Sequence, residues 1–556
     1  MKKNFFCLIF ILFLFISPKI VLAKGDIFYI DSSYDLFSRE KIEASLHQIS
    51  EKALFYVEDD YYSSLSPNEK KELEESLKKL GEEFSKVIYP ILTSNFGSEW
   101  TPGIDGEKRI IILVHQMKEG TGGYFREEDE YPKIQAPFSN EKEMLYLNPK
   151  YLTYPLLSKS FLAHEFVHLI TFNQKNRLRK VSEERWLNEL RAEYAPTLLG
   201  YDKTESEETN LKIRINHFLE NPSDSLINWE DEKADYGVIN LFGQYLVDHY
   251  GFKILRDSLR SSEVGISSIN YALKKNGFDI NFSQVFTDWI ITLLINNCQI
   301  GEKYCYKNEL LKEIRISPFL NFLPLSGEST LTYGNSTQIF TGNWFKIIGG
   351  RGTLKLRFDG AEDAEFEVFF ILEKTNEGYE IRSLELDEKQ DGEILIPNFG
   401  KEISSLILIP LALPRDTLSY SEFTSYYSFF WSASLIKNQS QNEELINQLL
   451  KEVERLKREI EEVQKKIYEI LSNKFYCKSI RMDLRYGMKN DQVKCLQQFL
   501  KAQGKDIYPE GLVTGYFGPL TRSAVIRFQE KYAKEILEPL GLKKGTGFVG
   551  PKTRAK

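Results

Sequence analysis

Two histidines four positions apart, with a glutamate after the first, form the string best suited to chemistry in this 556-residue chain: His164, Glu165 and His168. On a helix the two histidines lie one turn apart on the same face, so both imidazoles can reach one Zn²⁺ at about 2.0–2.1 Å. Glu165 then lies beside the ion, where it can accept a proton from water and pass it to a leaving amine. With 6 His and 80 Asp plus Glu, chance gives such a match about 0.01 times per chain. The string predicts a catalytic zinc site, and a pair of core histidines is the alternative.

A second segment, Trp186–Tyr194, supplies carboxylates for such a site. Two histidines leave the ion one protein ligand short of the usual catalytic three, and Glu189 is the predicted third ligand. Glu193 follows one helical turn later on the same face, where it can accept the second ring proton of His164 and fix the ring's orientation. Pro196 and Gly200 are expected to terminate the helix. A solvent-exposed helix face is the alternative explanation for both acids.

The negative charge that develops on a substrate carbonyl needs an electrophile besides the metal. Tyr236 and His217, on downstream helices, are the candidates. Tyr236 is equally suited to packing at a helix start. The apolar run Met144–Leu147 is predicted to form the strand that flanks the cleft and pairs with the backbone of a peptide substrate.

The order of the motifs distinguishes two classes of zinc peptidase. A metzincin needs glycine and histidine further along the first helix, where this chain has Thr171 and Gln174. An HExxH helix followed by a helix with Asn188 and Glu189 instead resembles the thermolysin-like gluzincins. This resemblance implies a zincin catalytic domain of the α+β class.

A longer stretch, from about Lys24 to Asn297, is most similar to the hyicolysin-type neutral zinc metallopeptidases. The similarity includes Gly122–Phe125 and Ser139–Tyr146 before the motif and Tyr236–Gly251 after it. It implies an endopeptidase that acts on proteins or peptides, and it favours Tyr236 over His217. Leu190 departs from the family pattern, which commonly has glycine after the third-ligand glutamate.

The elements that must position these residues are expected within 24–318, as a small sheet followed by a mostly helical half. Short apolar runs at Ala53–Val57 and Arg109–Val114 are suited to strands. Between them, Ser66-Pro67-Asn68-Glu69 is a capping box with proline at the first helical position, so it opens a long charged helix toward Pro90. After Pro155 nearly every segment is expected to be helical.

The pattern changes to period two at 325–437. Thr353–Phe358 alternates polar and apolar residues, and similar runs follow at short spacing with Gly, Asp and Asn between them. Several such strands in about 110 residues predict a β-sandwich. No catalytic constellation is visible in it.

Residues 442–472 carry a heptad pattern. Ile446, Val453, Ile460 and Ile467 share one register, and Leu449, Leu456, Val463 and Ile470 share the other. This spacing makes a coiled-coil seam, which indicates either a parallel homodimer or a single long helix that spaces the domains.

The tail, 475–556, contains an internal repeat. Gly515–Arg522 recurs as Gly547–Arg554, each a tight turn followed by a helix, with Thr521 expected as the N-cap. Together with Leu484, Leu496 and similar positions, the repeat closely resembles the small all-α peptidoglycan-binding domain of bacterial wall enzymes. The resemblance implies that the tail binds cell wall.

The first 23 residues indicate export. Lys2 and Lys3 precede an apolar run that Pro18 interrupts, and small residues end at Ala23, which is typical of a cleaved signal peptide and too short for a membrane anchor. Export to an oxidising compartment makes disulfides expected among the four remaining cysteines. Four cysteines allow three pairings, and proximity favours two pairs: Cys298 with Cys305, and Cys477 with Cys495.

The charge balance excludes one class of function. With 72 Lys plus Arg against 80 Asp plus Glu, the net charge is −8, and no dense basic cluster appears, so no nucleic-acid partner is expected. The sequence therefore predicts a multidomain, secreted or wall-associated zinc endopeptidase. The alternatives are a zinc hydrolase of peptidoglycan stem peptides and an inactive wall-binding adhesin.

Overall fold

The computed structural model describes residues 25–203, 208–324, 329–376, 378–414, 425–436, 452–464, 466, 477 and 479–556. The chain divides into two compact units, 1–439 and 440–556. The predicted signal peptide, 1–23, lies outside the described residues. No helix among the described residues has the length and hydrophobicity needed to cross a membrane.

The first unit begins with a six-stranded sheet in the order β1-β2-β3-β4-β6-β5. Strands β1 to β3 are antiparallel, β3, β4 and β6 run parallel, and β5 returns antiparallel to β6. The strands are β1 (Asp26–Tyr29), β2 (Lys41–Ile49), β3 (Ala53–Glu58), β4 (Ile110–Val114), β5 (Gly123–Tyr124) and β6 (Met144–Leu147). The three predicted runs are β3, β4 and β6.

The capping box predicted at Ser66 is confirmed: its side chain accepts from Glu69 N, and the Glu69 carboxylate accepts from Ser66 N. The helix it opens, α2 (Pro67–Glu83), continues through the π-helical turn η1 (Phe84–Ile88) into α3 (Tyr89–Phe96). Pro90 therefore does not end the helix: it lies in the first turn of α3, directly after the π-helical turn, where the regular hydrogen-bond pattern already changes.

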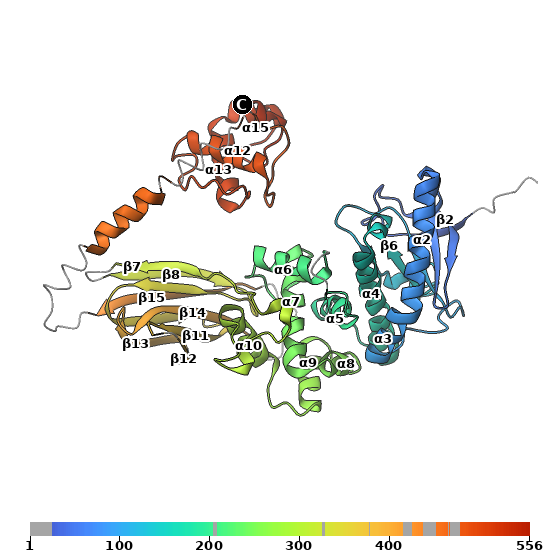
Figure 1. The fold of residues 1–556 in the computed structure, drawn as a ribbon, viewed down its shortest axis with the longest axis horizontal. Helices are drawn as coiled ribbons and strands as arrows, with labels where there is room; N and C mark the ends of the chain where they lie inside the picture. Colours follow the sequence, from blue (N-terminus) through green and yellow to red (C-terminus); the bar gives the residue numbers. More distant parts are fainter. Residues whose placement is uncertain are drawn as a thin grey trace, which may run out of the picture. The chain divides into compact units, whose positions relative to one another are not determined.

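Helices follow the sheet, as expected (Figure 1). They are α4 (Pro155–Thr171) with the π-helical turn η4 (Phe172–Arg177), α5 (Arg185–Leu198), α6 (Asn210–Glu220), α7 (Lys233–Tyr250), α8 (Lys253–Leu259), α9 (Gly265–Lys275) and α10 (Phe282–Ile295). Before α2 lies the short α1 (Asp59–Ser64). Pro196 lies inside α5 and not at its end, because the helix continues to Leu198.

Nine strands lie among the described residues of 319–436. They are β7 (Phe319–Leu323), β8 (Thr330–Thr337), β9 (Phe345–Gly349), β10 (Gly352–Gly360), β11 (Glu365–Lys374), β12 (Tyr379–Leu384), β13 (Asp391–Phe399), β14 (Ile403–Leu413) and β15 (Tyr427–Ile436). The ladder has two parts, β12-β11-β14-β9-β7 and β13-β10-β15-β8, joined by the single pair Phe399 and Ile403. Across them the Phe345 ring lies 6.0 Å from the Phe429 ring and 5.7 Å from Trp431. The two parts of the ladder thus pack face to face around an apolar interior, as in a sandwich.

The strand region and the helices share one hydrophobic core. The Phe340 ring contacts Phe282 and Phe286 of α10 at 5.1 and 5.2 Å, and Trp344 Nε1 donates to Ile290 O. The strands are therefore packed against the helical half and belong to the same compact unit.

The tail is a small helical domain with its own core, built on α12 (Asp491–Ala502), α13 (Pro519–Lys531), α14 (Ala533–Ile536) and α15 (Pro551–Ala555). One buried glutamine binds each repeat. Gln497 Nε2 donates to Tyr516 O and Thr521 Oγ1, and its Oε1 accepts from Gly515 N. Gln529 makes the same three bonds thirty-two residues later, to Phe548 O, Thr553 Oγ1 and Gly547 N.

Thr521 is not the N-cap that the sequence predicted. Gly518 is the N-cap of α13, and Thr521 lies inside its first turn, with Pro519 at the helix start. The Thr521 hydroxyl instead accepts from the buried Gln497 amide. The repeated threonine is therefore explained by its hydrogen bond to the buried glutamine of the preceding helix, and not by capping.

Two disulfides join the cysteine pairs favoured by proximity, Cys298 with Cys305 and Cys477 with Cys495. Within 442–472 the structure describes 452–464 and 466, which are helical. Leu456, Ile460 and Val463 of the heptad seam are exposed there. The remainder of the predicted spacer helix lies outside the described residues.

Candidate metal centre

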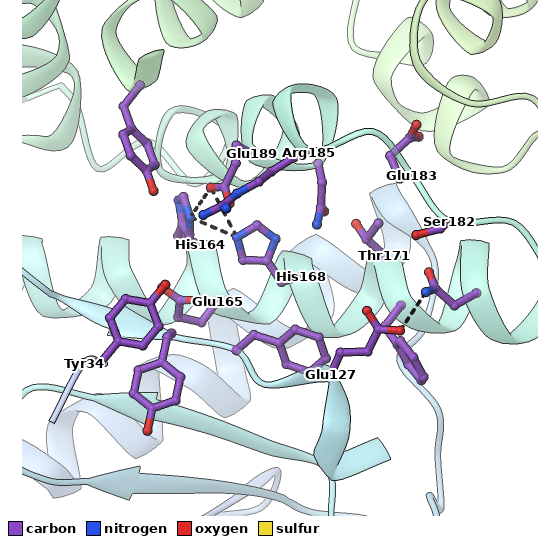
Figure 2. A pocket seen from close by; sticks show the side chains of 17 residues that line it. Tyr34, Glu127, His164, Glu165, His168, Thr171, Ser182, Glu183, Arg185 and Glu189 are labelled. Atoms are coloured by element: carbon purple, nitrogen blue, oxygen red, sulfur yellow. Dashed lines mark hydrogen bonds and ion pairs between the residues drawn. The ribbon is translucent and has the colours of Figure 1, made fainter. Parts of the chain in front are cut away.

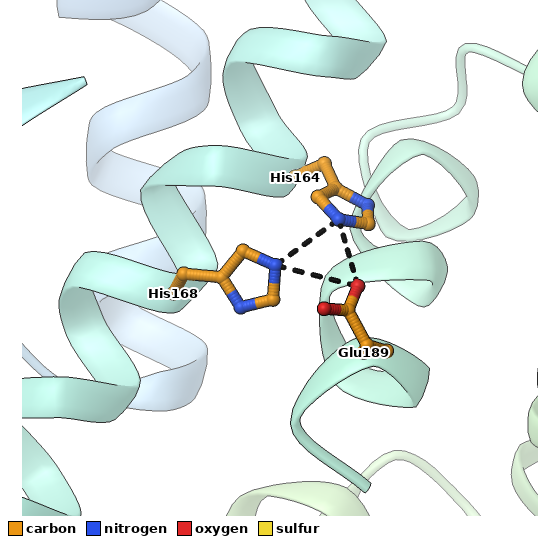
Figure 3. A group of neighbouring side chains, drawn as sticks. All are labelled: His164, His168 and Glu189. Carbon is orange, nitrogen blue, oxygen red and sulfur yellow. Dashed lines mark hydrogen bonds and ion pairs between the residues drawn. The ribbon is translucent and has the colours of Figure 1, made fainter. Parts of the chain in front are cut away.

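The HExxH string lies on α4, a helix that is apolar on nearly all sides and therefore largely buried. Phe166 on this helix stacks against Tyr89 of α3 at 5.4 Å, and the other face of α4 packs on α5. His164 and His168 point from α4 toward Glu189 on α5 (Figure 3). The burial of both helices fixes the distance between the two sets of side chains.

Three candidate ligand atoms converge at one point. His164 Nε2 and His168 Nε2 lie 3.1 Å apart, and Glu189 Oε2 lies 3.2 Å from the first and 3.5 Å from the second. Donors about 2.0–2.1 Å from a tetrahedral ion lie about 3.3–3.4 Å from one another. The separations and the His, His, Glu donor set both fit a zinc ion with one position left for substrate or water.

Glu193 fixes the orientation of His164. Its Oε1 lies 3.2 Å from His164 Nδ1, the ring atom that faces away from the ligand group. Arg214 donates two hydrogen bonds to the Glu193 carboxylate, at 2.7 and 2.8 Å, and Asn210 and Asn240 donate one each. This completely buried carboxylate is therefore held by charge and by hydrogen bonds. His168 Nδ1 has no hydrogen-bond partner among the described residues, so the polar contacts of that ring are made through Nε2.

The ionisation of the cluster follows from these contacts. Burial alone lowers the pKa of His164, but hydrogen bonds with Glu189 and Glu193 outweigh burial and raise this pKa to about 10. Burial opposes ionisation of Glu189, yet the neighbouring His168 and His164 hold the pKa of its carboxyl well below the ordinary range. Burial raises the pKa of Glu165. A metal ion that binds here must therefore displace a proton from His164.

Glu165 lines the same cavity as the three ligand candidates, a space of about 320 Å³ (Figure 2). A Cβ atom at Gly123 would lie 3.1 Å from Glu165 Cγ and 2.6 Å from Tyr146 O. Only glycine therefore leaves room for both the glutamate and the neighbouring strand. The Glu165 side chain thus lies in the same cavity as the two histidines.

The edge of the sheet beside the cavity is β5 and not β6, the strand predicted at Met144–Leu147. β6 lies between β4 and β5, so both of its edges are occupied. Gly123, Tyr124 and Phe125 line the cavity instead. The two-residue strand was missed because it is too short to show an alternating pattern.

Tyr236 and His217 differ in their placement. Tyr236, in the first turn of α7, lines the cavity, and the Arg214 guanidinium lies 4.6 Å from its ring centroid. Gly237 permits this position, because a Cβ there would lie 2.5 Å from Phe218 N of α6. His217 is not among the cavity-lining residues; its Nδ1 lies 3.4 Å from Arg214 Nη1. Burial and the Arg214 charge lower the pKa of His217 to about 4.

Tyr34 was not predicted, although it lines the cavity and points toward Glu165 (Figure 2). Its ring stacks on Tyr124 at 4.8 Å, and Tyr124 stacks on Tyr146 at 4.3 Å. The neighbouring Asp35 is completely buried and bonds Arg39, which fixes the loop between β1 and β2. No local pattern marks Tyr34, because only the sheet brings it to a helix about 130 residues away.

Comparison with known proteins gives two kinds of similarity in sequence. Residues 489–556 match the family model described as "Putative peptidoglycan binding domain". The chain is also 27% identical over 271 residues to the neutral metalloprotease ShpI of Staphylococcus hyicus, a match that covers 43% of this chain. The chain spans 55% of the length of that relative.

Similarity to solved structures is weak over the whole chain. The structure of the M60 catalytic domain with the CBM51-1 and CBM51-2 domains from Clostridium perfringens ZmpB aligns over 71% of this chain and 60% of that one. The sequence identity is 8% and the TM-score is 0.24.

Proposed function

We propose that this protein is a zinc-dependent peptidase of the gluzincin type, with His164, His168 and Glu189 as ligands. The supporting observation is the meeting of three ligand atoms at 3.1–3.5 Å in one cavity with Glu165. The similarity to a neutral metalloprotease gives independent support. A binding protein without catalysis has no need of this set, which argues against the adhesin alternative.

In this proposal each cavity residue has a chemical role. A zinc ion at this site would polarise the substrate carbonyl and acidify the attacking water. Glu165 takes the proton from the water and passes it to the leaving amine. Tyr236 donates a hydrogen bond to the carbonyl oxygen as its charge develops. Glu193, held by Arg214, keeps His164 oriented so that Nε2 remains a ligand.

The test is zinc content and protein hydrolysis measured on the same purified chain. We expect about one zinc per chain, hydrolysis of casein, and loss of hydrolysis on treatment with a chelator that zinc reverses. Glu165→Gln serves as the matched control, because it retains the ligands and removes the base. Hydrolysis that persists after complete removal of zinc would contradict the proposal.

We further propose that the tail anchors the enzyme to peptidoglycan. Two observations support a folded wall-binding module: the family match at 489–556 and the repeated hydrogen bonds of Gln497 and Gln529. The same match favours a second candidate activity, hydrolysis of peptidoglycan stem peptides. Digestion of purified sacculi beside casein separates the two substrates, since a stem-peptide hydrolase releases soluble wall fragments and leaves casein intact.

Export and dimerisation complete the proposal. The signal-like residues 1–23 and the two disulfides support a secreted or wall-associated location. The exposed Leu456, Ile460 and Val463 support a homodimer through the heptad segment. Light scattering tests the dimer, which Ile460→Asp should convert to a monomer.

A further inference from the structure

The cavity extends beyond His168 into a compartment of different composition. Thr171 follows one turn later on α4, and Phe172 and Asn176 come from η4. Phe125 and Glu127, from the segment after β5, form the facing wall. In the view of Figure 2, Glu127 and Tyr34 lie on opposite sides of His168. Glu127 and Tyr34 therefore line the same cavity as the candidate metal centre, at different places along it.

The Glu127 carboxylate is held in place by neutral groups. Tyr131 Oη and Asn176 Nδ2 each donate to Glu127 Oε1 at 3.0 Å. Among the described residues no lysine, arginine or histidine lies within ion-pair distance of Glu127. Glu127 is thus an exposed residue of the cavity lining, with Oε1 bonded to two neutral donors and no cationic partner among the described residues.

The other charged groups of the cavity wall, apart from the catalytic cluster, are already paired. Glu183 bonds Arg191 at 2.7 Å and lies 3.3 Å from Lys175 Nζ. Arg185 Nη2 lies 3.2 Å from Asp231 Oδ1. Because these charges are matched within the protein, Glu127 supplies the unbalanced charge beyond His168.

Apolar surface lies next to this carboxylate. The Phe172 ring is 6.2 Å from Phe125 and 5.5 Å from Tyr131. Thr171 is 2% exposed, and its hydroxyl has no hydrogen-bond partner among the described residues. An aromatic wall that leads to an acid fits a side chain with an apolar stem and a cationic end.

We propose that Glu127 is a specificity-determining residue that selects substrates with a lysine-type or arginine-type side chain close to the scissile bond. The stem packs against Phe125 and Phe172, and the ammonium or guanidinium group pairs with the free oxygen of Glu127. This inference rests on the proposed peptidase function, because it concerns which peptides that site accepts. The same ammonium chemistry is offered by proteins and by wall peptides that contain a diamino acid.

The test uses the zinc-loaded full chain and peptides that differ at one position near the cleaved bond, carrying lysine, leucine or glutamate. We expect kcat/KM to be highest for the lysine peptide. Glu127→Gln keeps both hydrogen bonds but loses the charge, so kcat/KM for the lysine peptide should fall roughly tenfold and that for the leucine peptide should stay constant. Glu127→Lys should reverse the preference toward glutamate. A stem peptide with a free side-chain amine, assayed in parallel, distinguishes a wall source from a protein source.

Glu128→Lys is the matched control, because Glu128 has the same charge, lies one residue away and does not line the cavity. It should leave the preference unchanged, and all variants should keep wild-type zinc content. Equal preference in wild type and Glu127→Lys, with active enzyme, would overturn the role of Glu127 and leave the peptidase proposal intact. If the zinc-loaded wild type cleaves none of these peptides or casein, the proposed function fails and this inference fails with it.

Discussion

The candidate metal centre and the C-terminal domain bury polar side chains in different ways. Around α4 and α5 the polar groups are ionisable: His168, Glu189 and Glu193 are buried, and their partners His164 and Arg214 are 12% and 14% exposed. In the tail the buried polar side chains Gln497 and Gln529 are neutral amides. Each amide donates to a backbone carbonyl and a threonine hydroxyl and accepts from a glycine N–H. Burying charge is costly unless it is balanced, whereas a fully bonded amide costs little. The charged cluster therefore points to chemistry, and the amides point to a requirement of folding.

The largest effect is expected from removal of a ligand. His168→Ala leaves two of the three candidate ligands, so zinc affinity should fall by roughly a hundredfold or more and hydrolysis should disappear. Zinc measured by elemental analysis after dialysis, together with a casein assay, checks both effects. If the variant kept its zinc, His168 would not be a ligand. The difference between ionisable groups in the first unit and neutral amides in the tail would then say less about chemistry.

Glu165→Gln should separate metal binding from proton transfer. The amide has nearly the same size but cannot act as a base, so turnover should fall by roughly 10²–10⁴ while zinc content stays at one per chain. Single-turnover assays beside zinc analysis provide the measurement. Turnover close to wild type would assign the base to another residue of the cavity.

The raised pKa of His164 predicts how zinc affinity depends on pH. Because the folded-state pKa is about 10 against 6.5 for a free histidine, zinc must displace a proton at neutral pH. Affinity should therefore rise with pH, by roughly tenfold per unit between pH 7 and 9, and flatten above the pKa. Competition with a chromophoric chelator at several pH values measures this slope. A flat profile would mean that His164 carries no proton in the cluster.

The buried amides of the tail should affect folding and leave the metal centre unchanged. Gln497→Ala leaves Gly515 N and Tyr516 O without their partner, at a cost of about 1–3 kcal/mol in the stability of that domain. Gln529→Ala should cost a similar amount, and Gln498→Ala, on the half-buried neighbour, should cost little. Urea unfolding and pelleting with sacculi report the loss. A fall in hydrolysis of a soluble peptide would show that the tail supports the active site.

Local spacing was enough to predict that His164, His168 and Glu189 meet at one point, because a helix converts sequence spacing into direction. His164, His168 and Glu189 each follow from the faces of α4 and α5, and Glu193 follows from one further turn. Arg214 and Asn240, which hold Glu193, come from α6 and α7 and show no pattern that links them to it. Tertiary packing, which no local pattern encodes, brings them together.

In the fold, too, elements marked by a local sequence pattern were predicted, and features that depend on tertiary contacts were not. The runs at β3, β4 and β6 are dense in apolar residues and were predicted, whereas β1 is short and β2 is amphipathic with only two buried positions. Thr521 was misassigned because proline and glycine before it also start helices, and the bond from Gln497 depends on packing between α12 and α13.

We propose that the first unit carries a zinc-dependent peptidase that works independently of the tail. The most direct test is a zinc titration of metal-free protein, with peptide hydrolysis followed at each step, for the full chain and for a chain that ends at Lys437. We predict that activity rises in proportion to zinc, saturates at one ion per chain and reaches the same turnover in both proteins. Activity without zinc, or a folded and zinc-loaded shorter chain that fails to turn over, would contradict the claim.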